Sequence, residues 1–277
     1  MKTIKGSTKI GVSTLPFLTM PIDKAVEFII SLDVTIIELF MDVPYAHPYN
    51  LNKKIINNLN KLKDMYNISY FIHPPCYDLN PATLNKSLQK EIITQYVYSI
   101  KLAEELEARG MVVHSGHLSL PEANREEVIN SSINFIKNLT EEAYKRGVKL
   151  LIENTGYGIN SLFKNHLDFF EYLKRLETDH PIYSVLDVGH AYLQGFDLIE
   201  AVKSLKKMIA HVHLHDNKGI ADEHLPLGKG VIPLVPFIKT LKKEVNPATT
   251  MIIEIAPNPV EKVLKNLKNS IRFVKDI

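Results

Sequence analysis

Short apolar segments alternate with longer amphipathic segments along the chain, and the alternation occurs eight times. The short segments are rich in Val and Ile and are bounded by turn residues. Such uninterrupted apolar runs are typical of parallel strands that are buried on both faces. The predicted strands are Lys9–Ser13, Thr35–Phe40, Ser69–His73, Met111–Ser115, Lys149–Asn154, Ile182–Asp187, Ile209–His215 and Thr250–Ala256.

The longer segments carry apolar residues at helical spacing. In Asn85–Ala108, for example, Leu88 and Ile92 lie one turn apart. The segment Glu122–Arg146 stops before Gly147, a residue type that often follows the last turn of a helix. The other predicted helices are Leu51–Tyr66, His166–Glu177, Leu198–Leu205, Leu234–Glu244 and Pro259–Val274.

Strands that alternate with helices eight times predict a single (β/α)8 TIM barrel, an α/β fold, as one domain over residues 1–277. A doubly wound open sheet is the alternative. That alternative is weakened because no GxGxxG motif follows the first predicted strand.

Composition narrows the compartment and the class of protein. The chain of 277 residues is 45% hydrophobic and 23% charged, which is enough apolar material for a sizeable core and excludes a disordered chain. Its one cysteine, Cys76, excludes a disulfide framework. No apolar run approaches the roughly 18–20 residues of a membrane span, and the start MKTIKGSTK lacks an apolar signal core. We therefore expect a cytoplasmic protein without a membrane partner.

Side chains that can bind metal ions are concentrated at the predicted carboxyl ends of the strands and in the loops that follow. In a (β/α)8 barrel this end carries the active site, so these side chains should converge there. A buried carboxylate, such as the one in MIIEI, needs a partner, and a divalent cation can serve. The candidate metal ligands are His73, His114, Glu153, Asp187, His190, His213, Asp222, His224 and Glu254.

Four of these residues form the predicted core of the site: Glu153, Asp187, His213 and Glu254. Three carboxylates and an imidazole suit Zn²⁺, Mn²⁺, Mg²⁺ or Co²⁺. His211, His213 and His215 share one face of the seventh strand by the period of two, so spacing alone leaves open which of them binds the ion. For any one histidine taken alone, a hydrogen-bonded structural role is the ordinary alternative.

At these positions the sequence resembles the xylose-isomerase-like TIM barrels, a superfamily that includes sugar isomerases and epimerases and also the endonuclease IV repair enzymes (AP endonuclease family 2). The resemblance extends from about Ile10 to Glu254. It is carried by the segments IHPPCYDLN, VVHSGH, LLIENTGYG, VLDVGHA, HVHLHDNKG, DEHLPLGKG and MIIEI.

The sugar-processing members imply one divalent ion held by Glu153, Asp187, His213 and Glu254. In them the two glutamates also act as acid and base, and the equivalent of His190 contacts the substrate. The sequence departs from the ketose 3-epimerases in one stretch, because Lys218 and Gly219 stand where those enzymes have an arginine after the metal-binding histidine. A second glutamate of that family is also missing.

Endonuclease IV implies three zinc ions. By resemblance, one would be held by His73, His114 and Glu153, and a second by the four core residues with Glu153 shared. The third would be held by His190, Asp222 and His224. The surroundings depart from this family, because its Asp-Thr/Ser-Cys/Ser-His pattern reads Asp187-Val188-Gly189-His190 here.

Charge in the predicted loops favours a small substrate over a nucleic acid. The loops 41–52, 74–82, 116–122 and 188–197 contain no Lys or Arg. A protein that binds duplex DNA must neutralise several phosphates. Three divalent ions against four ligand carboxylates would leave a local charge of about +2, which suits one phosphate group.

The sequence therefore predicts a divalent-metal-dependent isomerase or epimerase of a sugar or sugar phosphate. Glu153 and Glu254 would act as the catalytic base and acid beside a carbonyl group polarised by one metal ion. The alternatives are an endonuclease IV-like phosphodiesterase with up to three zinc ions that cleaves duplex DNA at abasic sites, and a metal-binding barrel without catalysis.

Four residues are predicted to contact the substrate: His190, Glu38, Lys218 and Lys229. Three of them have an equally simple structural explanation. Glu38 could instead pair with a neighbouring cation, Lys218 could be a solvated loop residue, and the Gly-Lys-Gly sequence around Lys229 could form a glycine turn.

Overall fold

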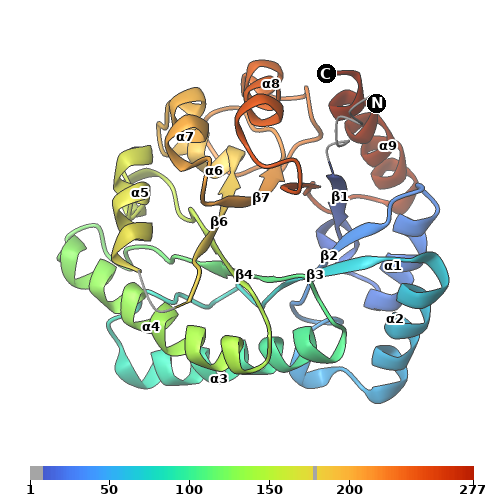
Figure 1. The fold of residues 1–277 in the computed structure, drawn as a ribbon, viewed down its shortest axis with the longest axis horizontal. Coiled ribbons are helices and arrows are strands. Elements are labelled where there is room, and N and C mark those ends of the chain that lie inside the picture. The colour runs from blue at the N-terminus through green and yellow to red at the C-terminus, as the bar shows by residue number, and fades with distance from the viewer. Residues whose placement is uncertain (1–8, 177–179) are drawn as a thin grey trace, which may run out of the picture.

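The computed structural model describes residues 9–176 and 180–277, which form a closed barrel of eight parallel strands surrounded by helices (Figure 1). Each strand pairs with the next one in sequence, and β8 pairs with β1. The predicted (β/α)8 barrel is therefore confirmed. The strands are Lys9–Ser13 (β1), Ile36–Phe40 (β2), Ser69–His73 (β3), Met111–His114 (β4), Leu150–Glu153 (β5), Tyr183–Asp187 (β6), Ile209–Leu214 (β7) and Thr250–Ile253 (β8).

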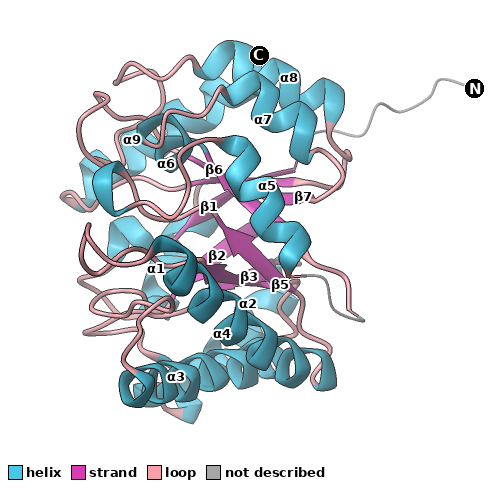
Figure 2. Cartoon of the chain, turned by 90° about the vertical axis from the view of Figure 1, so that its left-hand side faces the viewer, coloured by secondary structure: helices cyan, strands magenta, loops and turns pink. Residues whose placement is uncertain are grey.

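Helices form the outer layer around the strands (Figure 2). They are Ile22–Ile30 (α1), Lys53–Tyr66 (α2), Lys86–Glu105 (α3), Arg125–Lys145 (α4), His166–Arg175 (α5), Val188–Leu193 (α6), Leu198–Leu205 (α7), Leu234–Glu244 (α8) and Val260–Asp276 (α9). Three short 3-10 turns cover Leu15–Phe17, Pro48–Asn50 and Gly158–Asn160. No helix in residues 9–176 and 180–277 is long and apolar enough to cross a membrane.

All seven predicted helices are present, and side-chain caps fix the starts of five of them, α2, α3, α4, α5 and α7. Asn52, Asn85 and Asn124 accept hydrogen bonds from free backbone N–H groups of the first turns of α2, α3 and α4. The predicted helix ranges include these three asparagines, whereas the observed helices begin one residue after each of them. The predicted end of α5 at Glu177 lies outside the described residues, as does most of the start MKTIKGSTK.

Several strands are shorter than predicted at their carboxyl ends. Ser115, Asn154, His215 and Glu254 each come directly after the last residue of a strand instead of lying within it. Glu254 nevertheless remains tied to the sheet, because its N–H donates to the carbonyl of Leu214 at 3.1 Å. The residues that follow the strands form the floor and rim of the barrel mouth.

Apolar side chains pack in two places. The larger set fills the space between the outer face of the barrel and the helices. A smaller set fills the barrel interior below the mouth: Ile36, Phe71, Val112, Leu151, Val185 and Ile252. Burial of each such side chain contributes roughly 1.5–3 kcal/mol. The interior therefore has a dry floor, and the polar side chains at the strand ends lie above it.

Candidate metal centre

Four consecutive strands each end on a candidate ligand: β3 on His73, β4 on His114, β5 on Glu153 and β6 on Asp187. The strand register places His114 level with Glu153, and Asp187 level with His213 of β7. Neighbouring strands lie about 4.8 Å apart, so paired residues that face inward bring their side chains together. The barrel itself therefore assembles most of the site.

The first group consists of His73, His114 and Glu153. The two Nε2 atoms lie 3.1 Å apart, and Oε2 of Glu153 lies 3.2 Å from Nε2 of His114 and 3.9 Å from Nε2 of His73. Ligands of one tetrahedral zinc ion, bound at 2.0–2.2 Å, have atoms separated by about 3.4 Å. The spacing in this group therefore matches that of ligands to a single ion.

The second group surrounds Nδ1 of His213. Three carboxylate oxygens lie near this nitrogen: Oε1 of Glu153 at 3.3 Å, Oε2 of Glu254 at 3.5 Å and Oδ2 of Asp187 at 3.7 Å. All four side chains are buried. Glu153 presents one oxygen to the first group and the other to the second, which is the arrangement of a bridging ligand.

The third group consists of His190, Asp222 and His224. Oδ2 of Asp222 lies 3.0 Å from Nε2 of His190 and 3.1 Å from Nε2 of His224. Helix α6 supplies His190, and the Asp187 carboxylate caps this helix by accepting the His190 N–H at 2.7 Å. The loop after β7 supplies the other two residues. All nine predicted ligands therefore lie in one cluster.

Hydrogen bonds at the far side of the rings set which nitrogen faces each group. Nδ1 of His73 lies 2.9 Å from the carbonyl of Pro74, and Nδ1 of His224 lies 3.1 Å from the carbonyl of Glu254. A carbonyl oxygen can only accept, so each Nδ1 carries a proton, and Nε2 of the neutral His73 ring presents a lone pair. Burial acts to lower the pKa of His224, but the hydrogen bond to Asp222 outweighs it and raises this pKa to about 9, so Nε2 of His224 must lose its proton before it can bind a metal ion. Metal-binding histidines are usually oriented by such bonds.

The other two histidines in and just after β7 contact other carboxylates. His211 lies 2.9 Å from a Glu38 oxygen, deeper in the barrel, and Nε2 of His215 lies 3.1 Å from both oxygens of Asp187. The choice among the three histidines that spacing left open therefore falls on His213, because its Nδ1 faces three carboxylates.

Glu38 lies beneath the cluster. It is 0% exposed, and its carboxylate lies 3.2 Å from Nε2 of His213. It is not among the described residues that line the cavity above. Glu38 therefore pairs with a neighbouring imidazole, as the structural explanation of this residue expects, and can orient His213. It does not face the cavity in which a substrate would bind.

Replacing Glu38 with Gln should weaken metal binding about 10–100-fold, since loss of an orienting partner of a ligand typically has this effect. Competition with a chromogenic chelator would measure the affinity. Glu171→Gln, on the outer helix α5 and paired with Lys174, serves as the matched control. Equal affinities for wild type and Glu38→Gln would contradict the orienting role.

The electrostatics keep two of the candidate ligands, His73 and Glu153, in their metal-binding forms. Burial, together with the nearby His114 ring, lowers the pKa of His73 to about 4. Burial acts to raise the pKa of Glu153, but His213 and His114 outweigh it and hold this pKa well below its ordinary value. A neutral imidazole and an ionised carboxylate are the forms that bind metal ions.

Buried atoms without hydrogen-bond partners also point to missing cations. Within the described residues they include Oε2 of Glu153, Oδ1 of Asp222 and Nδ1 of His190. A buried polar atom left without a partner costs about 1–3 kcal/mol. These atoms belong to three different residues of one cluster, so bound divalent ions would satisfy them together. The donor set therefore fits a centre of divalent metal ions.

A cavity of about 300 Å³ opens above the cluster. Leu15, Phe40, Tyr77, Ala256 and Pro257 form its less polar wall, and no Lys or Arg is among the described residues that line it. A site with this lining can attract an anionic substrate only through ions bound at the ligands.

Two predicted lysine contacts lie outside this cavity. Lys218 is 65% exposed and pairs with Glu223 at 3.1 Å. The N–H groups of Gly228 and Gly230 donate to the carboxylate of Asp216 at 3.1 and 2.8 Å, so they close a turn and are not free for a phosphate. Lys229, between them, is exposed. This arrangement agrees with the glycine-turn alternative.

Sequence reasoning missed two residues that hold Asp187 and its neighbours in place. Asn154 accepts the Asp187 N–H at 2.8 Å and donates to the Asp187 carbonyl at 3.1 Å. Gly189 lies against the ring of His215, where a Cβ atom would be 1.9 Å from Cε1. The Asn of the segment ENTG ends a predicted strand, which is the one sequence feature that could have indicated Asn154. Nothing in the sequence indicated the role of Gly189.

Comparison with known proteins places the chain in a family. The family model described as "Xylose isomerase-like TIM barrel" matches residues 26–277. The chain belongs to this family. The uncharacterized protein MJ1614 of Methanocaldococcus jannaschii is 32% identical over 238 residues, which cover 85% of this chain and 88% of the relative. The "Probable endonuclease 4" of Halothermothrix orenii is 29% identical over 195 residues, which cover 65% of this chain and 68% of the relative.

Two solved structures resemble nearly the whole chain. A D-tagatose 3-epimerase-like protein has a TM-score of 0.78 and 27% identity, and the match covers 97% of this chain and 98% of that one. The IolI protein, solved with a zinc atom, has a TM-score of 0.79 at 18% identity, with 96% and 97% covered. The second likeness concerns the fold alone. Together the relatives indicate an enzyme and leave sugar and nucleic-acid chemistry to be distinguished.

Proposed function

We propose that the protein is a divalent-metal-dependent phosphoesterase that acts on a small, sugar-like phosphate ester. The observation that carries this proposal is that three groups of candidate ligands lie in one cluster beneath one cavity, with the Glu153 carboxylate shared between the first and second groups. An isomerase that uses one ion has no need of the first and third groups. Here both have the spacing of metal ligands.

The charge of the loaded site supports a phosphate group as the part of the substrate that is bound. Three divalent ions against the four ligand carboxylates leave about +2, in a cavity whose described lining has no other cation. Bound ions would supply positive charge and Lewis acidity to the phosphate. Glu153 would be a ligand shared by two of the ions, and His190 and Asp222 would hold the third.

The cavity wall supports a compact, partly apolar substrate. Phe40 stacks on the ring of His73 with centroids 4.4 Å apart and, with Leu15, offers an apolar surface to one face of a sugar. Tyr77 is 51% exposed at the same wall and can donate its hydroxyl to a substrate oxygen. A volume of about 300 Å³ is at the lower end for ligand pockets, which favours a monosaccharide over a polymer.

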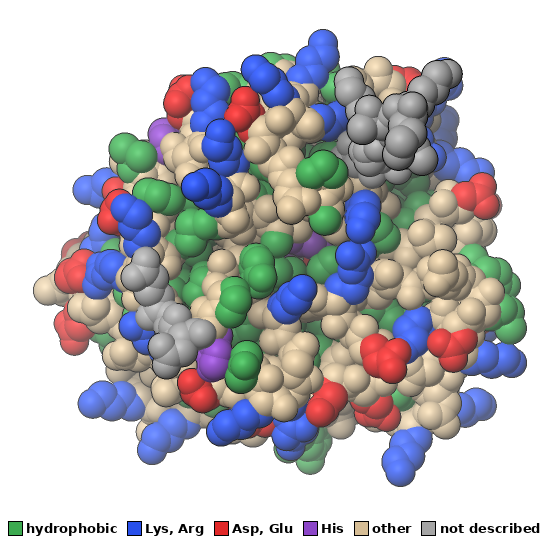
Figure 3. Space-filling model, viewed as in Figure 1, with side chains coloured by type: hydrophobic (Ala, Val, Ile, Leu, Met, Phe, Trp, Pro, Cys, Tyr) green, Lys and Arg blue, Asp and Glu red, His purple; other side chains and the backbone are tan. Residues whose placement is uncertain are grey.

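The distribution of cations makes duplex DNA a poor substrate. Arg109, Lys149, Lys206 and Lys207 line a separate hollow of about 580 Å³ at the amino-terminal ends of the strands, opposite the candidate site. Figure 3 shows Lys and Arg side chains spread over the face of the molecule seen in Figure 1. A duplex that reached the cluster would meet loops with few cations.

Protein purified without chelator should contain about three ions of zinc or a similar metal per chain, because three groups of ligands are preformed. Elemental mass spectrometry measures the content, and release of nitrophenol from bis(p-nitrophenyl) phosphate and p-nitrophenyl phosphate measures the activity. Chelation should abolish activity and added Zn²⁺ should restore it. Incision of an abasic duplex at a comparable rate would instead support a DNA substrate, and metal-independent turnover would contradict the proposal.

Sugar epimerisation is the second candidate, and the placement of two carboxylates favours it. Glu153 and Glu254 both lie beside His213, at 3.3 and 3.5 Å, and both line the cavity. One could remove a proton from a carbon beside a carbonyl while the other returns it. Deuterium incorporation from D₂O into a ketose, with one ion per chain and no phosphate release, would favour this candidate over hydrolysis.

A further inference from the structure

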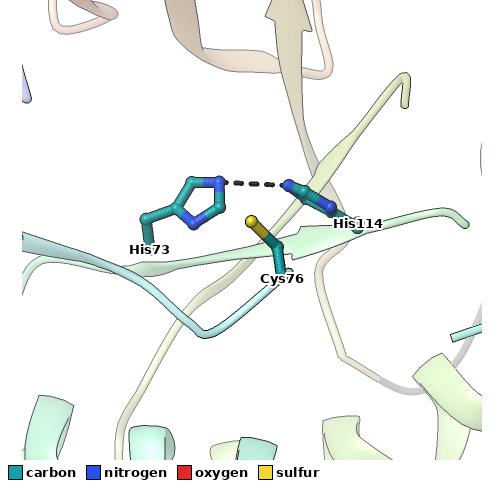
Figure 4. Close-up of side chains that lie close together, drawn as sticks. All are labelled: His73, Cys76 and His114. Atoms are coloured by element: carbon teal, nitrogen blue, oxygen red, sulfur yellow. Dashed lines mark hydrogen bonds between the residues drawn. The ribbon is translucent and has the colours of Figure 1, made fainter. Parts of the chain in front are cut away.

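Cys76 lies beside the first ligand group. Its Sγ is within 4.8 Å of ring nitrogens of both His73 and His114. Figure 4 shows the sulfur pointing toward the space between the two imidazole rings. The cysteine comes from the loop after β3, whereas the two histidines end β3 and β4.

The loop that carries Cys76 is held by a buried carboxylate. Oδ2 of Asp42, which is 2% exposed, accepts the N–H groups of Cys76 and Tyr77 at 2.9 and 3.0 Å. Charge-assisted hydrogen bonds of this kind fix the backbone firmly. The direction of the cysteine side chain is therefore a consequence of a built turn and not of a free loop.

Glu153 supplies an independent indication that a cation belongs here. Its Oε2 atom is buried, has no hydrogen-bond partner within the described residues, and lies 3.2 Å from Nε2 of His114. Nε2 of His73 presents a lone pair to the same space, because its Nδ1 donates to Pro74. Nε2 of His114 lies 3.1 Å from this nitrogen and can donate its one proton to it, so the buried Glu153 oxygen is left without a donor unless a cation lies between the three groups.

We infer that Cys76 binds, as a thiolate, the same metal ion as His73, His114 and Glu153, and that this position therefore selects zinc over manganese or magnesium. The inference deepens the proposed function and rests on its metal centre. Thiolate sulfur prefers zinc and other soft or borderline ions, whereas carboxylates and water suit magnesium and manganese. The other two groups have no thiolate among their described residues.

Metal binding by Cys76 balances in protons and electrons. The thiol releases its proton to solvent as the metal–sulfur bond forms, and no electron is transferred. The thiolate lowers the charge of a three-ion site from about +2 to about +1, which still attracts a phosphate. Sulfur and nitrogen ligands of one zinc lie about 3.6 Å apart, and Sγ of Cys76 already lies within 4.8 Å of ring nitrogens of both histidines.

Cobalt substitution tests the inference directly. The metal-free protein is titrated with Co²⁺ to three equivalents, and its absorption spectrum is recorded. A cobalt–thiolate bond gives an intense near-ultraviolet charge-transfer band that nitrogen and oxygen ligands do not give. Because Cys76 is the one cysteine in the chain, the band can have no other source within the protein. We expect the band to saturate with one of the bound equivalents.

Cys76→Ser should lose this band and keep the visible bands of cobalt bound elsewhere, while Asp78→Asn, in the same loop, should keep both. If the serine variant fails to fold, protection of the wild-type thiol from a disulfide reagent by Zn²⁺ but not by Mg²⁺ gives the same information. Cobalt bound without a charge-transfer band would overturn the role of Cys76 and leave the metal centre intact. No cobalt binding at all would overturn the centre itself.

Discussion

Replacing Glu153 with Gln should empty two of the three ion positions and lower turnover roughly a thousandfold, since loss of metal-supplied charge stabilisation is worth several kcal/mol. The carboxylate has one oxygen 3.2 Å from His114 and the other 3.3 Å from both His213 and His190. An amide can offer only one oxygen. Its NH₂ group would face nitrogen lone pairs or a cation, so neither neighbouring group keeps its full set of ligands.

Metal content by elemental mass spectrometry and phosphoester turnover should be measured on the same preparation. Glu105→Gln, at the end of the outer helix α3 and therefore at the opposite end of the barrel, removes an equal charge and should retain both properties. Circular dichroism establishes that the Glu153 variant is folded. Three ions and wild-type turnover in that variant would show that Glu153 is not a bridging ligand.

The fold and the convergence of the candidate ligands were predictable because the same feature encodes both. A buried parallel strand is a continuous apolar run, so a polar residue at its end stands out, as His73, His114 and Asp187 do. In a barrel the ends of all strands meet, and convergence follows from topology alone. In the structure the register of β4 and β5 pairs His114 with Glu153, as the shared level of the strand ends suggests.

The division of labour within the cluster could not be predicted. Alternation places His211, His213 and His215 on one face. The ring that faces the carboxylates is decided by the height of each residue in the barrel, and that height depends on the pairing of β7 with β6. Glu38 presents the same difficulty, because its burial below the cluster depends on how deep β2 sits relative to β7.

Two helices of the structure, α1 and α6, were not predicted from the sequence, and the reasons differ. Helix α1 buries Ile22, Ala25, Val26 and Ile29, a spacing that does indicate a helix, although its cap residue, Pro21, makes no side-chain hydrogen bond. Helix α6 has six residues, Val188–Leu193, which is too short for periodicity to be informative. Its start is fixed by Asp187, a residue whose sequence context indicated metal binding and not a helix cap.

Helix α6 also leads to the second large expected effect. Gly189 lies within it, and replacement of a helical glycine by alanine normally stabilises a protein, by up to about 1 kcal/mol. Here a Cβ atom would lie 1.9 Å from Cε1 and 2.5 Å from Nε2 of His215. The ring has little room to retreat, because it stacks on His224 with centroids 3.9 Å apart and bonds to both oxygens of Asp187.

We therefore expect Gly189→Ala to destabilise the protein by about 3 kcal/mol, the usual upper range for overpacking, and to lower Tm by roughly 6–12 °C. Displacement of His215 should also lower metal content, since Asp187 and His224 would lose their packing. Gly195→Ala, at a glycine with φ of 76° and open space around its Cβ position, controls for backbone strain alone.

The double variant Gly189→Ala with His215→Ala separates the clash from other causes. If the ring is the obstacle, its removal should recover part of the stability lost in Gly189→Ala, so that the double-mutant cycle gives a coupling energy of more than about 1 kcal/mol. Differential scanning calorimetry on metal-free and zinc-loaded protein measures the cycle in both states. Additive effects, or a Gly189→Ala variant as stable as wild type, would mean that His215 is not what requires glycine at this position.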